Sequence, residues 1–258
     1  MILHKLNELI PIHSDMQAFH PALMKLYPIA VSDPNDNILS IYDIDPSGKY
    51  SFITKETFDF PLPRKIRASF PIESYDSRCC CVVSSDIFDE ADGFVTFFHE
   101  FVHCYQHEHG EEKIKKSLSI SQKYDDPNWE LNHPFPYEEE FFKSAFLEIV
   151  NAAKQDESSK LRKRFKELRL RLEKYDYEYM IWQMWKEGFA RFIENRIREK
   201  YKLKRNNFGE LTQYNRISFY YLGDEIISCL HRLDKSVIID IERLFTILYN
   251  YEFDPKIS

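Results

Sequence analysis

The sequence predicts an α+β protein that is mainly helical, for three reasons. Only 6 of the 258 residues are Gly, which argues against a large all-β barrel because tight hairpin turns usually need positive φ. Hydrophobic residues make up 43% and aromatic residues 16%, so a sizeable core is expected despite 30% charged residues. Strand-like segments are confined to the first third, and helical periodicity dominates after about residue 90. We expect a single domain over residues 1–258, with an N-terminal α/β lobe to about residue 110 and a helical lobe over 111–258.

The N-terminal lobe is expected to contain a small sheet. Residues 2–30 have helical character broken by prolines, and residues 40–54 predict two strands joined by a turn at 45–49. Further short strands are expected over 65–70 and 78–84. The last of these contains Cys79, Cys80 and Cys81, which would point to alternate faces and could not all bind one ion. We interpret them as small buried side chains, and we expect all five cysteines to be reduced thiols.

The remaining two thirds of the chain read as helices around one long connection. Residues 93–109 contain no proline, and five apolar residues recur there at helical spacing, which predicts a mostly buried helix. Residues 110–137 are polar and end near two prolines, which is typical of a functional connection such as a lid or a substrate wall. Further helices are expected over 138–154, 158–175, 177–201, 211–221, 225–233 and 235–249.

Charge and hydropathy exclude several classes of protein. The net charge of −7 and the pI near 5.8 would repel a phosphate backbone, so we expect no nucleic-acid partner. In the basic segment 158–175, Leu161, Phe165, Leu168 and Leu172 share one face, which a solvated amphipathic helix explains better than a nucleic-acid surface. No apolar run reaches membrane-spanning length, and the start lacks a signal peptide, so we expect a cytoplasmic protein with no membrane partner.

The feature that carries chemistry is His99, Glu100, Phe101, Val102 and His103, an HExxH motif within the helix expected over 93–109. Residues four apart lie on one helix face, so both imidazoles can bind one zinc ion at about 2.0–2.1 Å. Glu100 is offset from that face and can reach a water held by the metal, whose pKa zinc lowers towards about 7. A chance occurrence would be easiest on a surface helix, whereas this motif is embedded in core-forming sequence.

A zinc site needs a third protein ligand, and two residues compete for this role. The metzincin pattern HExxHxxGxxH would use His109, but Gln106 stands where that pattern has Gly and tolerates positive φ poorly. His107 would then be a surface residue or a neighbour of a ligand. The stronger candidate is Glu187, in the segment MIWQMWKEGFARFIE.

This segment, taken with HEFVH, resembles the gluzincin metallopeptidases, and in particular the aminopeptidase branch whose pattern runs LNEGFARYxE. The resemblance implies a zincin-like fold in which the sheet packs on the HExxH helix, with Glu187 as the third zinc ligand. It also implies that Glu194 accepts a hydrogen bond from a ligand histidine. An exposed ion-pair ladder of Glu187, Arg191 and Glu194 is the alternative.

The resemblance covers about a third of the chain, and the chain departs from the family pattern. Here 83 residues separate His103 from Glu187, and no GxMEN-type segment is present, so aminopeptidase specificity is not implied. Downstream, Tyr220 and Gly223 resemble the YxxG element that supplies a phenol to the oxyanion in that family. Tyr221 is the adjacent alternative, and the run Glu138–Glu140 is best explained as the first turn of a helix.

The sequence therefore predicts a zinc-dependent metallopeptidase with one Zn²⁺ per chain, acting on a peptide or protein substrate. The metal ligands are His99, His103 and Glu187, Glu100 is the general base, and Tyr220 polarises the carbonyl oxygen. The competing hypothesis is a non-catalytic zinc-stabilised binding or regulatory protein with the same fold. The intact Glu100 weighs against it, because a structural zinc site needs no base.

Overall fold

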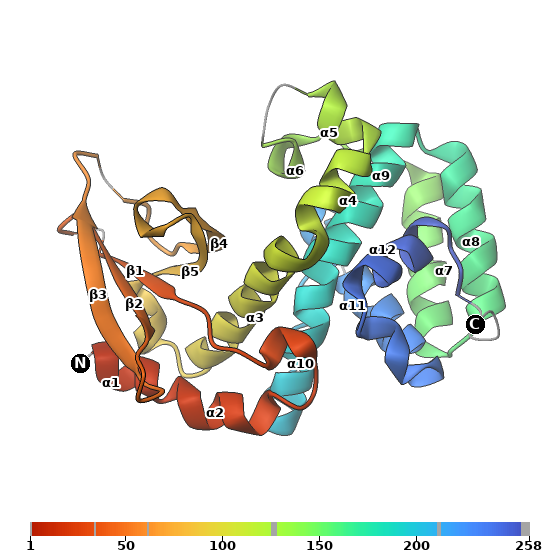
Figure 1. Ribbon diagram of the computed structural model, residues 1–258. Helices are drawn as coiled ribbons and strands as arrows, with labels where there is room; N and C mark the ends of the chain where they lie inside the picture. The colour runs from red at the N-terminus through yellow and green to blue at the C-terminus, as the bar shows by residue number, and fades with distance from the viewer. Residues whose placement is uncertain (1, 34, 61, 125–127, 211–212, 254–258) are drawn as a thin grey trace. The chain divides into compact units, whose positions relative to one another are not determined.

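The protein is described by a computed structural model over residues 2–33, 35–60, 62–124, 128–210 and 213–253 (Figure 1). The chain forms two compact units. The first contains the chain up to His109 together with Arg196–Lys204, and the second contains Gly110–Asn195 and the chain from Arg205 onward. The segment Arg196–Lys204 thus belongs to the first unit, although in sequence it lies among the residues of the second.

The first unit is built around a five-stranded mixed sheet with the order β3-β2-β1-β5-β4. Its strands are β1 (Ile29–Asp33), β2 (Ile38–Ile44), β3 (Tyr50–Thr57), β4 (Arg67–Ile72) and β5 (Arg78–Ser84). Strands β1 and β5 pair in parallel, and the other neighbours are antiparallel. The sheet therefore has β3 and β4 as its two edges.

Strand β1 corrects our expectation of helix up to residue 30. It lies in the middle of the sheet, and its residues Ile29, Ala30 and Val31 are all buried. A strand buried on both faces reads as a continuous apolar run without alternation, so its periodicity does not distinguish it from a helix. The predicted strands at 65–70 and 78–84 correspond to β4 and β5.

Helix α3 (Gly93–Gln106) packs on this sheet through contacts with β4 and β5, as Figure 1 shows. This confirms the expected sheet on the HExxH helix. The other helices of this unit are α1 (Ile2–Asn7), α2 (Leu9–Met16), η1 (Pro21–Leu23), η2 (Glu73–Tyr75) and η3 (Ser85–Asp89). All five cysteines of the chain are free and buried. The helices and the single small sheet together make an α+β fold that is mainly helical, as predicted.

The connection expected over 110–137 is largely helical, which corrects the prediction. It contains η4 (His107–Glu111, which begins before it), α4 (Glu112–Ser117), α5 (Ser119–Lys123) and α6 (Trp129–Asn132), and residues 125–127 lie outside the described ranges. These short helices are amphipathic pieces that bury Ile114, Ile120 and Trp129. One apolar residue per turn is too weak a signal to predict a helix of four to six residues.

The rest of the second unit follows the predicted helices with changed boundaries. They are α7 (Glu140–Lys154), α8 (Ser158–Arg171), α9 (Lys174–Gln183), η5 (Met184–Gly188), α10 (Phe189–Lys200, whose last turns belong to the first unit), α11 (Arg216–Leu233), η6 (Lys235–Ile238) and α12 (Ile241–Tyr249). The helices expected over 211–221 and 225–233 are one helix, α11, although residues 211–212 lie outside the described ranges. The helix continues through Gly223. Because this residue has no side chain, the backbone of η5 packs closely against it, and we expect this contact to stabilise the helix at that position.

Candidate metal centre

Helix α3 brings the two predicted ligand histidines together. The Nε2 atoms of His99 and His103 are 3.2 Å apart. Two nitrogen ligands at about 2.05 Å from a tetrahedral zinc ion are about 3.3 Å from each other. The pair therefore has the spacing that one zinc ion requires, and it arises from the i, i+4 geometry of the helix alone.

The ring of His103 is oriented by a residue that the sequence analysis did not assign to the site. Its Nδ1 lies 2.9 Å from Oε1 of Gln106, which is fully buried. When Nδ1–H donates to this amide oxygen, the lone pair is on Nε2, which is the atom that faces His99. The sequence contained a signal for this contact, because Gln106 lies three residues after His103 on the same helix. A hydrogen-bond partner of this kind raises the basicity of a ligand imidazole.

The carboxylate of Glu100 is held by strand β4. The Ser69 hydroxyl lies 2.8 Å from Oε2 of Glu100 and 2.8 Å from its backbone oxygen, so its single hydrogen can be donated to either. Only 5% of Glu100 is exposed. Ser69 was not found from the sequence, because a serine 31 positions away in an edge strand carries no local signal that relates it to a helix.

Glu187 lies in η5, a turn of π-helix between α9 and α10. A single wide turn of this kind inside a helix is frequent at functional sites, because it re-aims the side chains around it. The neighbouring Lys186 is bound to Glu111 and Glu130 at 2.5 and 3.2 Å. Gly188, next to the predicted ligand, packs against Gly223, where an added Cβ would lie 2.6 Å from the Gly223 Cα.

One group of residues in the described ranges meets the distances expected of metal ligands, and it consists of His99, His103 and Glu187. Each offers one ligand atom, and these atoms lie within 4.8 Å of one another. Two imidazoles and one carboxylate form a ligand set that suits zinc and leaves a coordination position open for a water or substrate. These three residues are the ones that the sequence analysis named.

His109, the alternative third ligand, does not belong to this group in the described part of the chain. Its exposed ring stacks on Tyr105 with centroids 4.0 Å apart, and its Nδ1 lies 2.9 Å from the Tyr105 backbone oxygen. His107 is exposed. The carboxylates of Glu138 and Glu140 are exposed and pair with Lys143. Helix α7 begins at Glu140, so only this residue of the run lies in the predicted first turn, and Glu138 and Glu139 precede the helix.

Tyr220, the predicted electrophile, lies in α11 close enough to Glu187 for the two to interact electrostatically. Burial and then the Glu187 carboxylate raise the pKa of Tyr220 well above its ordinary value, so the phenol keeps its proton and can donate a hydrogen bond. The hydroxyl of Tyr221 instead donates to Glu210 at 2.8 Å, and its side chain is buried in the core. Of the two tyrosines, Tyr220 is therefore the one associated with Glu187.

Glu194 and Arg191 form a buried ion pair at 3.4 Å, and the Asn206 side chain donates to Glu194 at 2.9 Å. The pair is not the exposed ladder that was the alternative, because both side chains are more than nine-tenths buried. A hydrogen bond from a ligand histidine to Glu194 stays a prediction.

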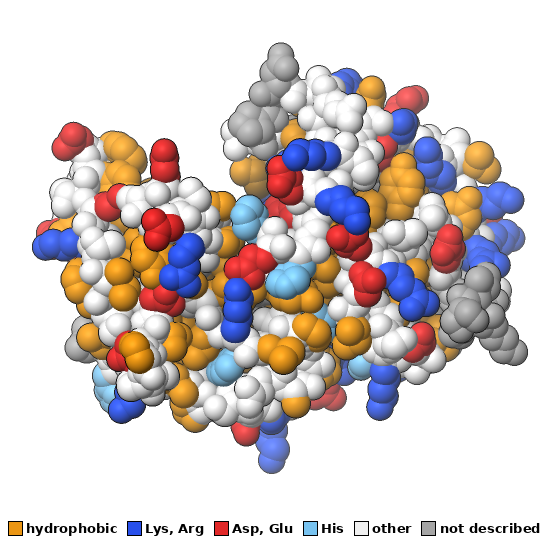
Figure 2. Space-filling view, in the orientation of Figure 1, with side chains coloured by type: hydrophobic (Ala, Val, Ile, Leu, Met, Phe, Trp, Pro, Cys, Tyr) orange, Lys and Arg blue, Asp and Glu red, His pale blue; other side chains and the backbone are white. Residues whose placement is uncertain are grey.

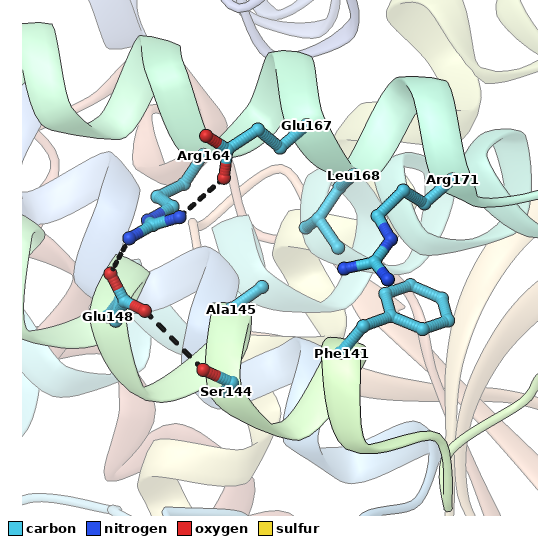
Figure 3. Close-up of a pocket in the computed structure, with 8 residues that line it drawn as sticks. All are labelled: Phe141, Ser144, Ala145, Glu148, Arg164, Glu167, Leu168 and Arg171. Atoms are coloured by element: carbon cyan, nitrogen blue, oxygen red, sulfur yellow. Dashed lines mark hydrogen bonds and ion pairs between the residues drawn. The ribbon is translucent and has the colours of Figure 1, made fainter.

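The basic segment 158–171 behaves as the amphipathic helix that was expected. Leu161, Phe165 and Leu168 of α8 are buried. Figure 3 shows a pocket beside this helix, where Arg164 pairs with Glu148 and Glu167 and Arg171 lies over the ring of Phe141. On the visible face in Figure 2, acidic and basic side chains are interspersed. Arg164 is thus neutralised within the protein.

Over the described ranges, no helix combines the length and the apolar character that a bilayer span requires. Comparison with protein-family models finds no match, and comparisons with curated proteins and with solved structures find none either.

Proposed function

We propose that this protein is a zinc-dependent metallopeptidase that hydrolyses peptide bonds, with His99, His103 and Glu187 as metal ligands. The observation that carries the proposal is the ligand group itself, in which two imidazole nitrogens 3.2 Å apart and one carboxylate gather within 4.8 Å. The order of the HEFVH and EGFARFIE segments and the intact base Glu100 support it further.

The residues of the chain have distinct roles in this reaction. When bound, zinc supplies a Lewis acid that acidifies a water molecule and polarises a carbonyl group. Glu100, oriented by Ser69, takes a proton from the attacking water and later returns it to the leaving nitrogen. Tyr220 donates a hydrogen bond to the oxygen that becomes negative in the tetrahedral intermediate.

Metal content tests the ligand set without knowledge of the substrate. Protein purified without added metal is expected to carry about one zinc per chain, measured by elemental mass spectrometry. His99→Ala, His103→Ala and Glu187→Ala should each lose the zinc, whereas His109→Ala should keep it. Full zinc occupancy in Glu187→Ala would refute the assignment of this ligand.

Turnover separates the peptidase from the non-catalytic zinc protein. A mixed peptide library incubated with the protein should be cleaved, and a chelator should stop the cleavage. Glu100→Gln should keep the zinc and the fold but lose hydrolysis, because an amide cannot accept the proton. A zinc-loaded wild-type protein that cleaves no peptide would favour the binding or regulatory alternative, and undiminished cleavage by Glu100→Gln would show that another base operates.

A further inference from the structure

Two arginines lie within cation–π distance of the ring of Tyr220. The guanidinium carbon of Arg191, from α10, is 5.8 Å from the ring centroid, and that of Arg216, from the first turn of α11, is 5.6 Å from it. Both distances are within the range of a cation–π interaction. The two arginines beside this candidate catalytic phenol differ in the groups that they bind.

Arg191 is already engaged within the protein. Only 6% of it is exposed, and it pairs with Glu194 at 3.4 Å. It also donates to the backbone oxygens of Asn206 and Phe208 at 3.4 and 3.1 Å. This arginine ties α10 to the segment that follows it, so its charge is used structurally.

Arg216 differs from Arg191 in its exposure and in its ion pairing. Its side chain is partly exposed, and no carboxylate of the described residues lies within ion-pair distance of it. Its charge nevertheless acts on Tyr137, Tyr179 and Tyr220, since it lowers the pKa of each against the larger effect of burial. Arg216 is therefore a cation directed at a cluster of phenols near Glu187, without a carboxylate partner among them.

We propose that Arg216 binds a carboxylate of the substrate, so that the enzyme prefers peptides with a negative charge close to the scissile bond. This inference rests on the proposed peptidase function. A guanidinium group forms bidentate, charge-assisted hydrogen bonds with a carboxylate, and a partly desolvated aromatic setting strengthens them. The carboxylate can be the C-terminus of a short peptide or the side chain of Asp or Glu in a longer one.

Matched peptides measure this preference. One N-acetylated peptide is compared with a free C-terminal carboxylate and with a C-terminal amide, and a third, amidated peptide carries an internal Glu. For wild type, kcat/KM should be higher by about tenfold or more for at least one carboxylate peptide, on the scale of a hydrogen bond to a charged group. Arg216→Gln should remove this ratio, and Arg216→Lys should restore part of it.

The controls separate a binding role from a structural one. Arg243→Gln removes an exposed arginine from the first turn of another helix, α12, and should leave the ratio unchanged. If Arg216 only packs on Tyr220, its replacement should lower kcat/KM for all three peptides equally, and that outcome overturns the proposal. An unchanged ratio in Arg216→Gln overturns it as well.

Equilibrium binding keeps the inference separate from the proposed reaction. Calorimetric titration of the same peptides into zinc-loaded Glu100→Gln measures their Kd without turnover. Tighter binding of a carboxylate peptide that disappears in Glu100→Gln/Arg216→Gln would support the subsite even if no peptide were hydrolysed. Equal Kd values for carboxylate and amide peptides would refute the subsite while leaving the zinc peptidase proposal intact.

Discussion

The reactive groups of α3 depend on two neighbours that belong to neither motif. Gln106 orients the imidazole of His103, and Ser69 orients the carboxylate of Glu100. Both contacts are made by buried or partly buried groups, where a hydrogen bond is stronger than in water and a missing partner is costly. A ligand and a base that are already held before substrate arrives lose less freedom in the transition state.

At the residue scale, Tyr220→Phe should lower kcat by about 10²-fold with little change in KM, because an oxyanion donor acts mainly in the transition state. Zinc content should be unaffected. The matched control is Tyr221→Phe, which removes the hydrogen bond to Glu210 and should cost about 1 kcal/mol of stability while leaving kcat near wild type. Wild-type kcat in Tyr220→Phe together with a large loss in Tyr221→Phe would move the role to Tyr221.

At the scale of elements, the contact between η5 and α11 depends on two glycines that face each other. A Cβ on Gly188 would lie 2.6 Å from Gly223 Cα, and a Cβ on Gly223 would lie 2.5 Å from the Met184 oxygen. These are backbone atoms that cannot rotate away, so the two elements would have to separate. The turn that carries Glu187 can therefore approach α11 this closely only because Gly188 and Gly223 have no side chains.

Gly188→Ala should accordingly lower the free energy of unfolding by about 1–3 kcal/mol or more, measured by urea denaturation, and should also weaken zinc binding through the displaced Glu187. Equal stability of the Gly188 variant and wild type would show that the contact can relax at no cost.

Helix α6 contributes a partly buried carboxylate that joins several elements. Glu130 binds Lys115 of α4 at 2.5 Å, Lys186 of η5 at 3.2 Å and the Trp182 indole of α9 at 2.9 Å. Burial alone would raise the pKa of Glu130, but the two lysines and the indole outweigh it and lower the pKa below its ordinary value. The ionised form is thus stabilised in the folded protein.

A lowered pKa makes the contribution of Glu130 to stability depend on pH in one direction. This stabilisation is fully present above about pH 4.3, the pKa of a Glu side chain in the unfolded chain. It is lost as the pH falls through the lower pKa that Glu130 has in the folded protein. Glu130→Gln should reduce the free energy of unfolding by about 1–3 kcal/mol at pH 7, and the difference from wild type should shrink below about pH 4. Glu112→Gln, which breaks an exposed pair with Lys116, should change little at any pH. A gap that widens in acid would contradict the assigned sign.

At the scale of the whole molecule, a bound metal should stabilise the chain, because its ligands come from motifs that are far apart in the sequence. Free zinc at a thousand times its Kd stabilises the folded state by about 4 kcal/mol, which corresponds to a rise in Tm of roughly 10 °C for a chain of this size. Differential scanning calorimetry with and without a chelator measures this shift. His103→Ala should unfold at one temperature in both conditions, and an equal shift in that variant would place the metal elsewhere.

Features that depend on local periodicity could be predicted from the sequence. The HExxH helix, the amphipathic face of α8 and the mainly helical composition were all predicted, because residues three or four apart on a helix share a face whatever surrounds them. The 3.2 Å spacing of the His99 and His103 nitrogens follows from the same geometry.

Features that depend on partners distant in the chain could not be predicted and became visible only in the folded structure. The parallel pairing of β1 with β5, the hydrogen bond from Ser69 to Glu100, the packing of Gly188 on Gly223 and the approach of Arg216 to Tyr220 all join separate elements. The short helices between residues 110 and 132 also needed burial against other elements, since helices of four to six residues are not stable alone. No local pattern encodes such contacts, because they arise only when the faces that periodicity defines are packed against one another.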